Sequence, residues 1–147
     1  MNIAVLNGPN LNLLGSREPH LYGTTTLADV ESRLRQVAGE LGVSIVCAQH
    51  NGEGELVTAI QQMRGKADGA IVNAGAYSHT SLAIRDAFAA TALPYVEVHV
   101  SNIYAREPER RQSILAAGAV GIIAGLGVAG YEMALRGLVE RLRSARA

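Results

Sequence analysis

The long segment from Asn7 to Gly23 carries side chains that could perform acid–base chemistry. It follows the apolar run Ile3–Leu6 and precedes an amphipathic helical pattern, and a connection of this length is usually functional or disordered. The segment includes Tyr22 and, five residues earlier, Arg17. A guanidinium beside a phenol stabilises the phenolate, which would make Tyr22 a usable general base. The alternative is a surface loop in which the tyrosine packs and the arginine is solvated.

Glu97 and His99 form a second candidate pair. They are two residues apart in the apolar run Tyr95–Val100, and alternate residues of a strand lie on one face. Glu97 can therefore accept a hydrogen bond from one imidazole nitrogen of His99, fix its tautomer and favour its protonated form. Such a pair would serve as a general acid oriented by a carboxylate. A satisfied core ion pair is the alternative, and a glutamate in an apolar strand needs a partner in either case.

Two further segments carry groups that could bind a polar ligand. Asn73 and His79 lie in a segment of glycine and other small residues, which lets the backbone approach a ligand closely. An ordinary turn with a helix N-cap is the alternative. Arg106 and Arg110 follow the fourth apolar run and would share a face if the segment is helical. Either could bind an anionic or polyhydroxylated ligand, although solvated arginines at such positions are common.

Other chemistries find less support. Lys66 is the only lysine and precedes the third apolar run, so Schiff-base catalysis is not expected. The histidines and the single Cys47 show no metal-binding spacing, so no metal is expected. Gly125–Gly130 matches G-x-G-x-x-G, but no strand or ribose-binding acid follows it. We interpret these glycines as a tight turn with close helix–strand packing and expect no nucleotide or flavin cofactor.

Five short apolar runs must position the candidate side chains. They alternate with helical patterns and cover Ile3–Leu6, Val43–Ala48, Gly69–Asn73, Tyr95–Val100 and Val120–Ala124. Continuous apolar strands separated by helices predict a parallel sheet covered on both faces. The expected fold is a flavodoxin-like three-layer α/β/α sandwich with a five-stranded parallel sheet. Ligands bind such sheets at the carboxyl ends of the strands, where Asn10, His50, Asn73, His79 and His99 all fall.

The helix signals are clearest after the first long loop. Apolar residues recur at three- and four-residue steps from Leu27 to Leu41, which predicts one buried helix face. Thr26 with Asp29 three residues later is an N-cap pair, and Gly42 stands where a C-cap glycine belongs. Further helices are expected around 56–63, over 81–90 and from 131 onward.

Length and charge favour one expected domain over residues 1–147. The 13 basic and 13 acidic residues balance, which argues against non-specific nucleic-acid or membrane-surface binding. No apolar run approaches the ~20 residues of a membrane span, and the N-terminus lacks the regions of a signal peptide. Cys47 alone excludes an intrachain disulfide and is expected to be inert. A cytoplasmic protein is expected.

Taken together, the candidate groups suit one reaction class. A base that needs neither metal nor lysine, an oriented histidine acid and a ring of neutral donors suit proton abstraction beside a carbonyl. Hydrogen bonds would hold the developing enolate while the acid protonates a departing hydroxyl. That combination indicates a hydro-lyase. The alternative from another class is a non-catalytic flavodoxin-like module that binds a small hydroxy acid at the same edge, without need of Tyr22.

The chain resembles the type II dehydroquinases (type II 3-dehydroquinate dehydratases) over nearly its whole length. The segments that carry the resemblance, in the same order and spacing, are Asn7–Tyr22, Asn73–Ser81, Glu97–Asn102, Arg106–Arg111 and Gly125–Tyr131. The resemblance implies conversion of 3-dehydroquinate to 3-dehydroshikimate in the shikimate pathway. It also implies a flavodoxin-like fold, no cofactor, and assembly as a dodecamer of four trimers.

The resemblance further implies a role for each matching residue. Tyr22 would remove a proton from the carbon beside the ketone, activated by Arg17 on a mobile lid. Asn10 would help bind the water that stabilises the enolate. His99 would protonate the departing hydroxyl, oriented by Glu97.

The same resemblance implies the substrate contacts. The substrate carboxylate would be held by Asn73, Ser101 and the backbone at Val100. His79 and Arg110 would hold the substrate hydroxyls. Asp86, on the third long helix, matches a residue that reaches into a neighbouring subunit's site within the trimer.

Overall fold

The computed structural model describes residues 1–16 and 18–147, with every side chain there except that of Tyr22. The strands in this part of the chain are β1 (Asn2–Asn7), β2 (Ser44–Gln49), β3 (Gly69–Asn73), β4 (Tyr95–His99) and β5 (Gly121–Ala124). The α-helices are α1 (Pro19–Tyr22), α2 (Leu27–Leu41), α3 (Glu53–Gln62), α4 (Leu82–Thr91) and α5 (Ala129–Arg146). Short 3-10 turns cover Leu11–Leu13, Gly75–His79, Ile103–Ala105, Pro108–Arg110 and Ala116–Gly118.

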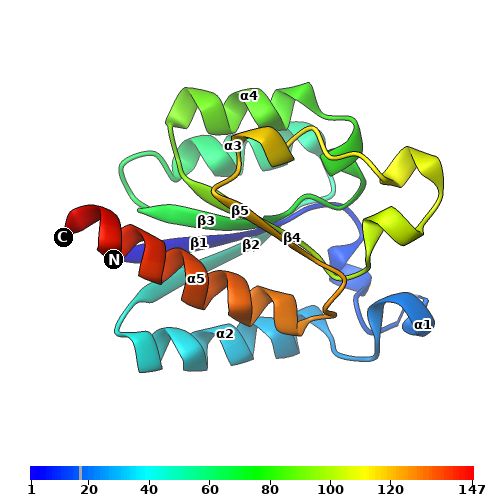
Figure 1. Cartoon of the computed structure of the whole chain (residues 1–147), viewed down its shortest axis with the longest axis horizontal. Helices are drawn as coiled ribbons and strands as arrows, with labels where there is room; N and C mark the ends of the chain where they lie inside the picture. The colour runs from blue at the N-terminus through cyan, green and yellow to red at the C-terminus, as the bar shows by residue number, and fades with distance from the viewer. Residues whose placement is uncertain (17) are drawn as a thin grey trace.

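The strands form one parallel sheet in the order β2-β1-β3-β4-β5. Helices α2 and α5 cover one face of this sheet and α3 and α4 cover the other (Figure 1). Each strand expected from the sequence is present, within one residue at each end. The predicted three-layer α/β/α fold is therefore confirmed.

The hydrophobic core is divided between the two faces of the sheet. One cluster packs β-strand residues such as Ile3 and Val98 against α2 and α5, and the other packs residues such as Ala4 and Val72 against α3 and α4. All five residues of β3 and of β4 are buried, which explains their continuous apolar sequence. Both edge strands are partly open, and Val46 of β2 and Ile122 of β5 are exposed.

The predicted helix signals are present at the ends of α2. Thr26 accepts a hydrogen bond from the Asp29 amide, and the Asp29 carboxylate accepts one from the Thr26 amide. This capping box satisfies two amides that the first turn leaves without partners. Gly42 ends the helix at φ 70°, a left-handed conformation that glycine adopts without a steric cost.

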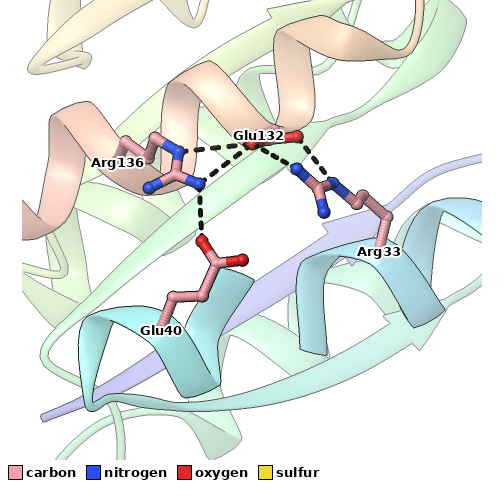
Figure 2. Close-up of polar contacts among 4 residues, drawn as sticks. All are labelled: Arg33, Glu40, Glu132 and Arg136. Carbon is pink, nitrogen blue, oxygen red and sulfur yellow. Dashed lines mark hydrogen bonds and ion pairs between the residues drawn. The ribbon is translucent and has the colours of Figure 1, made fainter. Parts of the chain in front are cut away.

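A network of four charged side chains joins α2 to α5 on the outer surface (Figure 2). Glu132 receives two hydrogen bonds of 2.9 Å from Arg33 and a 3.1 Å contact from Arg136, which also reaches Glu40 at 2.9 Å. The hydrogen bonds from Arg33 lower the pKa of Glu132. Isolated surface pairs contribute little to stability, and this network bridges the start of α5 to α2 above their shared hydrophobic core.

The turn before α5 has the role that its glycines predicted. Gly125 has a φ of 89°, and a Cβ on Gly130 would lie 3.2 Å from the side chain of Ile123. The glycines therefore provide a tight turn and close contact between α5 and the sheet. As a result, Tyr131 at the start of α5 lies fully buried under the sheet's carboxyl edge.

None of the described helices combines the length and the apolar character needed to cross a membrane.

Candidate active site

A pocket that is partly open to solvent lies at the carboxyl edge of the sheet. Its wall includes eight residues that the sequence had singled out: Asn10, Asn73, His79, His99, Val100, Ser101, Arg106 and Arg110. The remaining lining residues are Pro9, Leu11, Leu14, Gly75, Ala76 and Ile103. The sheet edge predicted to hold the ligand is therefore hollowed where the candidate residues meet.

The loops after β1 and β3 are joined at this edge. The Gly8 amide donates a 2.8 Å hydrogen bond to the Asn73 carbonyl. A Cβ on Gly8 would lie only 2.4 Å from the carbonyl oxygen of Ala74, so any other residue there would push the loops apart. Asn10 follows with a φ of 69°, and its amide donates to the side chain of Asn51 at 3.0 Å. These contacts place Asn10 beside the end of β3.

The predicted pair of Glu97 and His99 is present at the base of the pocket. The two side chains lie on one face of β4, and His99 Nε2 is 2.6 Å from Glu97 Oε1. Glu97 is completely buried and His99 is 5% exposed. Because Nε2 contacts the carboxylate, Nδ1 is the ring nitrogen left for a ligand in the pocket. A buried imidazole with this partner can deliver a proton from Nδ1.

Asn73 is oriented by a buried chain of hydrogen bonds. Its Nδ2 donates to the Tyr131 hydroxyl at 2.9 Å, and that hydroxyl donates to Asn7 Oδ1 at 2.6 Å. Asn73 Oδ1 accepts from the Gly75 amide at 3.2 Å. The second hydrogen of Nδ2 is therefore available to a ligand oxygen.

His79 is held beside His99 on the pocket wall. The two rings stack with centroids 6.1 Å apart. His79 Nδ1 lies 2.7 Å from the carbonyl of Gln112, and a carbonyl only accepts hydrogen bonds. The proton of neutral His79 is therefore on Nδ1, which leaves Nε2 as an acceptor for a ligand hydroxyl.

Two arginines give one side of the pocket a positive charge. Arg106 donates to Ser101 Oγ at 3.4 Å, and Arg110 forms an ion pair with Glu107. The segment that carries both arginines consists of separate 3-10 turns, so the helix that would have put them on one face is not formed. Both side chains nevertheless line the pocket.

Three predicted site residues are not seen at the pocket: one lies away from it, and two lie wholly or partly outside the described part of the structure. Arg17 and the side chain of Tyr22 lie outside the described part of the structure, although Tyr22 ends α1. Asp86 is exposed on α4 and is not part of the pocket wall. His50, at the same sheet edge, lies 3.6 Å from Glu55 instead.

Sequence reasoning missed several residues that shape the site. Leu11, Leu14 and Ile103 form an apolar part of the wall, but in the sequence they resemble ordinary packing residues. Ser113 donates to Glu97 Oε1 at 2.5 Å, and Tyr131 anchors Asn73. No local pattern marks either contact, because each joins segments that are distant along the chain.

Among the described residues, no group of three or more His, Cys, Asp or Glu side chains is placed to hold a metal ion. Burial raises the pKa of the Cys47 thiol to about 11, and Cys47 does not line the pocket. The thiol is therefore almost entirely protonated near neutral pH.

Comparison with known proteins places these features in context. The family model described as dehydroquinase class II matches residues 1–139. A 3-dehydroquinate dehydratase of Gemmatimonas aurantiaca is 62% identical over 146 residues, 99% of this chain and 96% of the relative. A catabolic 3-dehydroquinase of Penicillium rubens is 55% identical over 134 residues, 91% of this chain and 86% of that protein.

A solved structure is also similar throughout. The crystal structure of type II dehydroquinase from Propionibacterium acnes matches with a TM-score of 0.90 at 44% identity, covering 95% of this chain and 96% of that one.

Proposed function

The chain belongs to the class II dehydroquinase family, and from this premise we propose how its residues perform the family's reaction. It is a hydro-lyase that dehydrates 3-dehydroquinate to 3-dehydroshikimate in the shikimate pathway. One C–H bond and one C–O bond break, and the products are the enone and water. The proposal assigns the proton removed, the charge that develops and the proton returned to named groups.

In the first step, Tyr22 removes the proton from the carbon beside the ketone. Arg17 stabilises the phenolate that performs this step. Both assignments rest on the family pattern in Asn7–Tyr22, a segment that begins at the carboxyl end of β1 and contributes Asn10, Leu11 and Leu14 to the pocket wall. The negative charge moves to the ketone oxygen as an enolate. A water held by Asn10, which lines the pocket, stabilises that oxygen.

In the second step, the enolate collapses and the hydroxyl leaves with a proton from His99. The observation that carries this step is the buried contact of 2.6 Å between His99 Nε2 and Glu97 Oε1. Glu97 stabilises the protonated imidazole and fixes the ring, so that Nδ1–H is presented to the pocket. The proton on the leaving hydroxyl makes the departing group water.

The proposed substrate contacts use the hydrogen-bonding groups of the pocket wall. The substrate carboxylate is bound by Asn73 Nδ2, Ser101 and the backbone at Val100. His79 and Arg110 bind the ring hydroxyls. All five residues line the pocket, and the fixed orientations of Asn73 and His79 support these assignments.

We also propose the assembly and setting that the family pattern implies. Residues 1–147 act as one dehydroquinase domain without a cofactor, in a cytoplasmic dodecamer of four trimers. Asp86 then contributes to the site of a neighbouring chain, which agrees with its exposed position on α4 away from its own pocket.

Replacing Tyr22 by Phe tests the proposed base. Purified protein is mixed with 3-dehydroquinate, without added metal, and absorbance of the conjugated product is followed. Wild-type protein should give a steady rise, and Tyr22→Phe should lower kcat by about 10²–10⁴-fold, the usual contribution of a general base. Substrate binding measured by calorimetry should be largely retained.

Tyr104→Phe is the matched control, because Tyr104 is 59% exposed and does not line the pocket. It should retain wild-type turnover. Near-normal turnover by Tyr22→Phe would show that the base is another group. A flat trace from correctly assembled wild-type protein that still binds substrate would indicate a binding module.

A further inference from the structure

The buried carboxylate of Glu97 receives hydrogen bonds from two side chains, and both fall on the same oxygen. Glu97 Oε1 is 2.6 Å from His99 Nε2 and 2.5 Å from Ser113 Oγ. The other oxygen, Oε2, is buried and has no hydrogen-bond partner among the described residues. A fully buried carboxylate with so few partners is costly to keep charged. Each of the two donors therefore has a large influence on where the proton of the pair lies.

The direction of the Ser113 hydrogen bond is determined by its surroundings. The Leu115 amide donates to Ser113 Oγ at 3.2 Å, so the hydroxyl oxygen already accepts a bond. A serine hydroxyl has one hydrogen to donate, and Glu97 Oε1 is the acceptor within reach. Ser113 is therefore a donor to the carboxylate, and such a bond favours the charged form of Glu97.

The chain around Ser113 is tied to the turn that carries His79. The carbonyl of Gln112 faces His79 Nδ1 at 2.7 Å. The amide of Ile114 donates to the carbonyl of Ser78 at 2.9 Å, in the 3-10 turn that carries His79. Three consecutive residues thus hold the wall of the pocket against β4, which limits movement of the Ser113 hydroxyl relative to Glu97.

We propose that Ser113 is a positioning residue for the acid step, acting through Glu97 on His99. The proposal rests on the proposed role of His99 as the acid. By stabilising the Glu97 anion, Ser113 keeps the shared proton on His99 Nε2. The proton that His99 can release is then the one on Nδ1, toward the leaving hydroxyl. Without the Ser113 donor, the shared proton shifts toward Glu97 and His99 becomes a weaker acid.

The sign of the expected pH effect follows from the charges. When His99 releases its Nδ1 proton, a charged Glu97 is left beside a neutral His99. Loss of the Ser113 donor raises the free energy of this form more than that of the form before proton release. The earlier form is affected less because its shared proton can move onto Glu97. The high-pH limb of the kcat profile should therefore move to higher pH in Ser113→Ala.

Ser113→Ala is compared with wild type by kcat, KM and the pH profile of kcat. We expect kcat to fall by about tenfold or more, the effect of one hydrogen bond to a charged group, with KM changed less than threefold. The high-pH limb should move upward. Ser113→Thr, which keeps the hydroxyl, should restore both values toward wild type. If Ser113→Ala does not fold, Ser113→Cys, a weak donor, should show the same changes.

Ser78→Ala provides a matched control. Its hydroxyl is buried close by and makes no hydrogen bond with the described residues, so its loss should leave the pH profile unchanged. An unchanged kcat and an unmoved high-pH limb in Ser113→Ala would overturn the proposal. This holds even if the variant has a lower thermal stability, because that loss alone would indicate a purely structural role.

A spectroscopic measurement separates this inference from the proposed function. Nitrogen-15 NMR of the histidine rings in the unliganded protein reports which nitrogen of His99 carries the shared proton, whether or not substrate turns over. Ser113→Ala should reduce the protonated character of Nε2. Identical His99 spectra in the two proteins would reject the role of Ser113, even if the dehydratase activity is present.

Discussion

At the scale of single residues, the phenol of Tyr131 supports the site through a hydrogen bond to Asn7, which lies 124 residues away along the chain. It lies between Asn7 and Asn73 and is 1% exposed. Burial raises the pKa of Tyr131, so the hydroxyl stays protonated and can donate to Asn7 while it accepts from Asn73. The proposed contact of Asn73 with the substrate carboxylate thus depends on a residue that does not line the pocket.

Tyr131→Phe should weaken both the fold and the binding of substrate. It leaves Asn7 Oδ1 and Asn73 Nδ2 buried without this partner, which should lower the free energy of unfolding by about 1–3 kcal/mol. KM should rise because Asn73 loses its anchor. Urea denaturation and steady-state kinetics measure the two effects, with Tyr104→Phe as the exposed control. Unchanged stability and KM would contradict the anchoring role.

At the scale of elements, Asp68 connects three segments at the amino edge of the sheet. Its carboxylate accepts a 2.7 Å hydrogen bond from the Asn2 amide at the start of β1 and a 2.5 Å bond from Arg146 at the end of α5. The Asn2 amide, and then Arg146, lower the pKa of Asp68 below its ordinary 3.8. These two hydrogen bonds join the start of β1 and the end of α5 at the sheet edge opposite the pocket.

Asp68→Asn should destabilise the protein only while the carboxylate is charged. Because the pKa is lowered by folding, the stabilisation is fully present above pH 4 and is lost as the pH falls through the folded-state value. Urea denaturation at pH 7, 5 and 3 should therefore show a difference between the two proteins that shrinks at pH 3. Glu140→Gln, exposed on α5 and in none of the described ion pairs, is the control. A difference independent of pH would indicate a cause other than charge.

At the scale of the whole molecule, one proposed site residue lies away from the pocket of its own chain. Asp86 is exposed on α4, and Leu82 one turn earlier is 61% exposed. Residues four apart share a helix face, so an apolar side chain lies beside this carboxylate. If Asp86 serves the reaction, a second copy of the chain must receive it.

Mixed assemblies of two variants test this contribution. Asp86→Ala should lower kcat/KM, while Tyr22→Phe should nearly abolish turnover. In mixed oligomers, a site with its own Tyr22 can receive Asp86 from a Tyr22→Phe neighbour. Activity should then exceed the sum of the separate variants. No recovery in verified mixed oligomers would contradict the proposed sharing, and light scattering should give a mass near twelve times the 15.5 kDa of the chain.

The sequence alone was sufficient for the features that depend on neighbouring residues. Strand positions follow from short continuous apolar runs, and the capping box at Thr26 follows from a hydrogen-bonding pair three residues apart. The Glu97–His99 pair follows from the alternation of side chains along a strand. The parallel fold follows from alternating apolar runs and helices. Seven residues named by the family pattern line the pocket, whereas Asp86 does not, and Arg17 and the side chain of Tyr22 lie outside the described residues.

Only the tertiary structure decided how those residues are supported. Tyr131 and Asn7 are 124 residues apart, and Ser113 and Glu97 are 16 apart. Their contacts depend on the strand order, which places β1 beside β3 and β3 beside β4, and on the path of the loop after Ser101. Local propensity carries no information about such distances, since the hydrogen bonds form only after distant segments have packed.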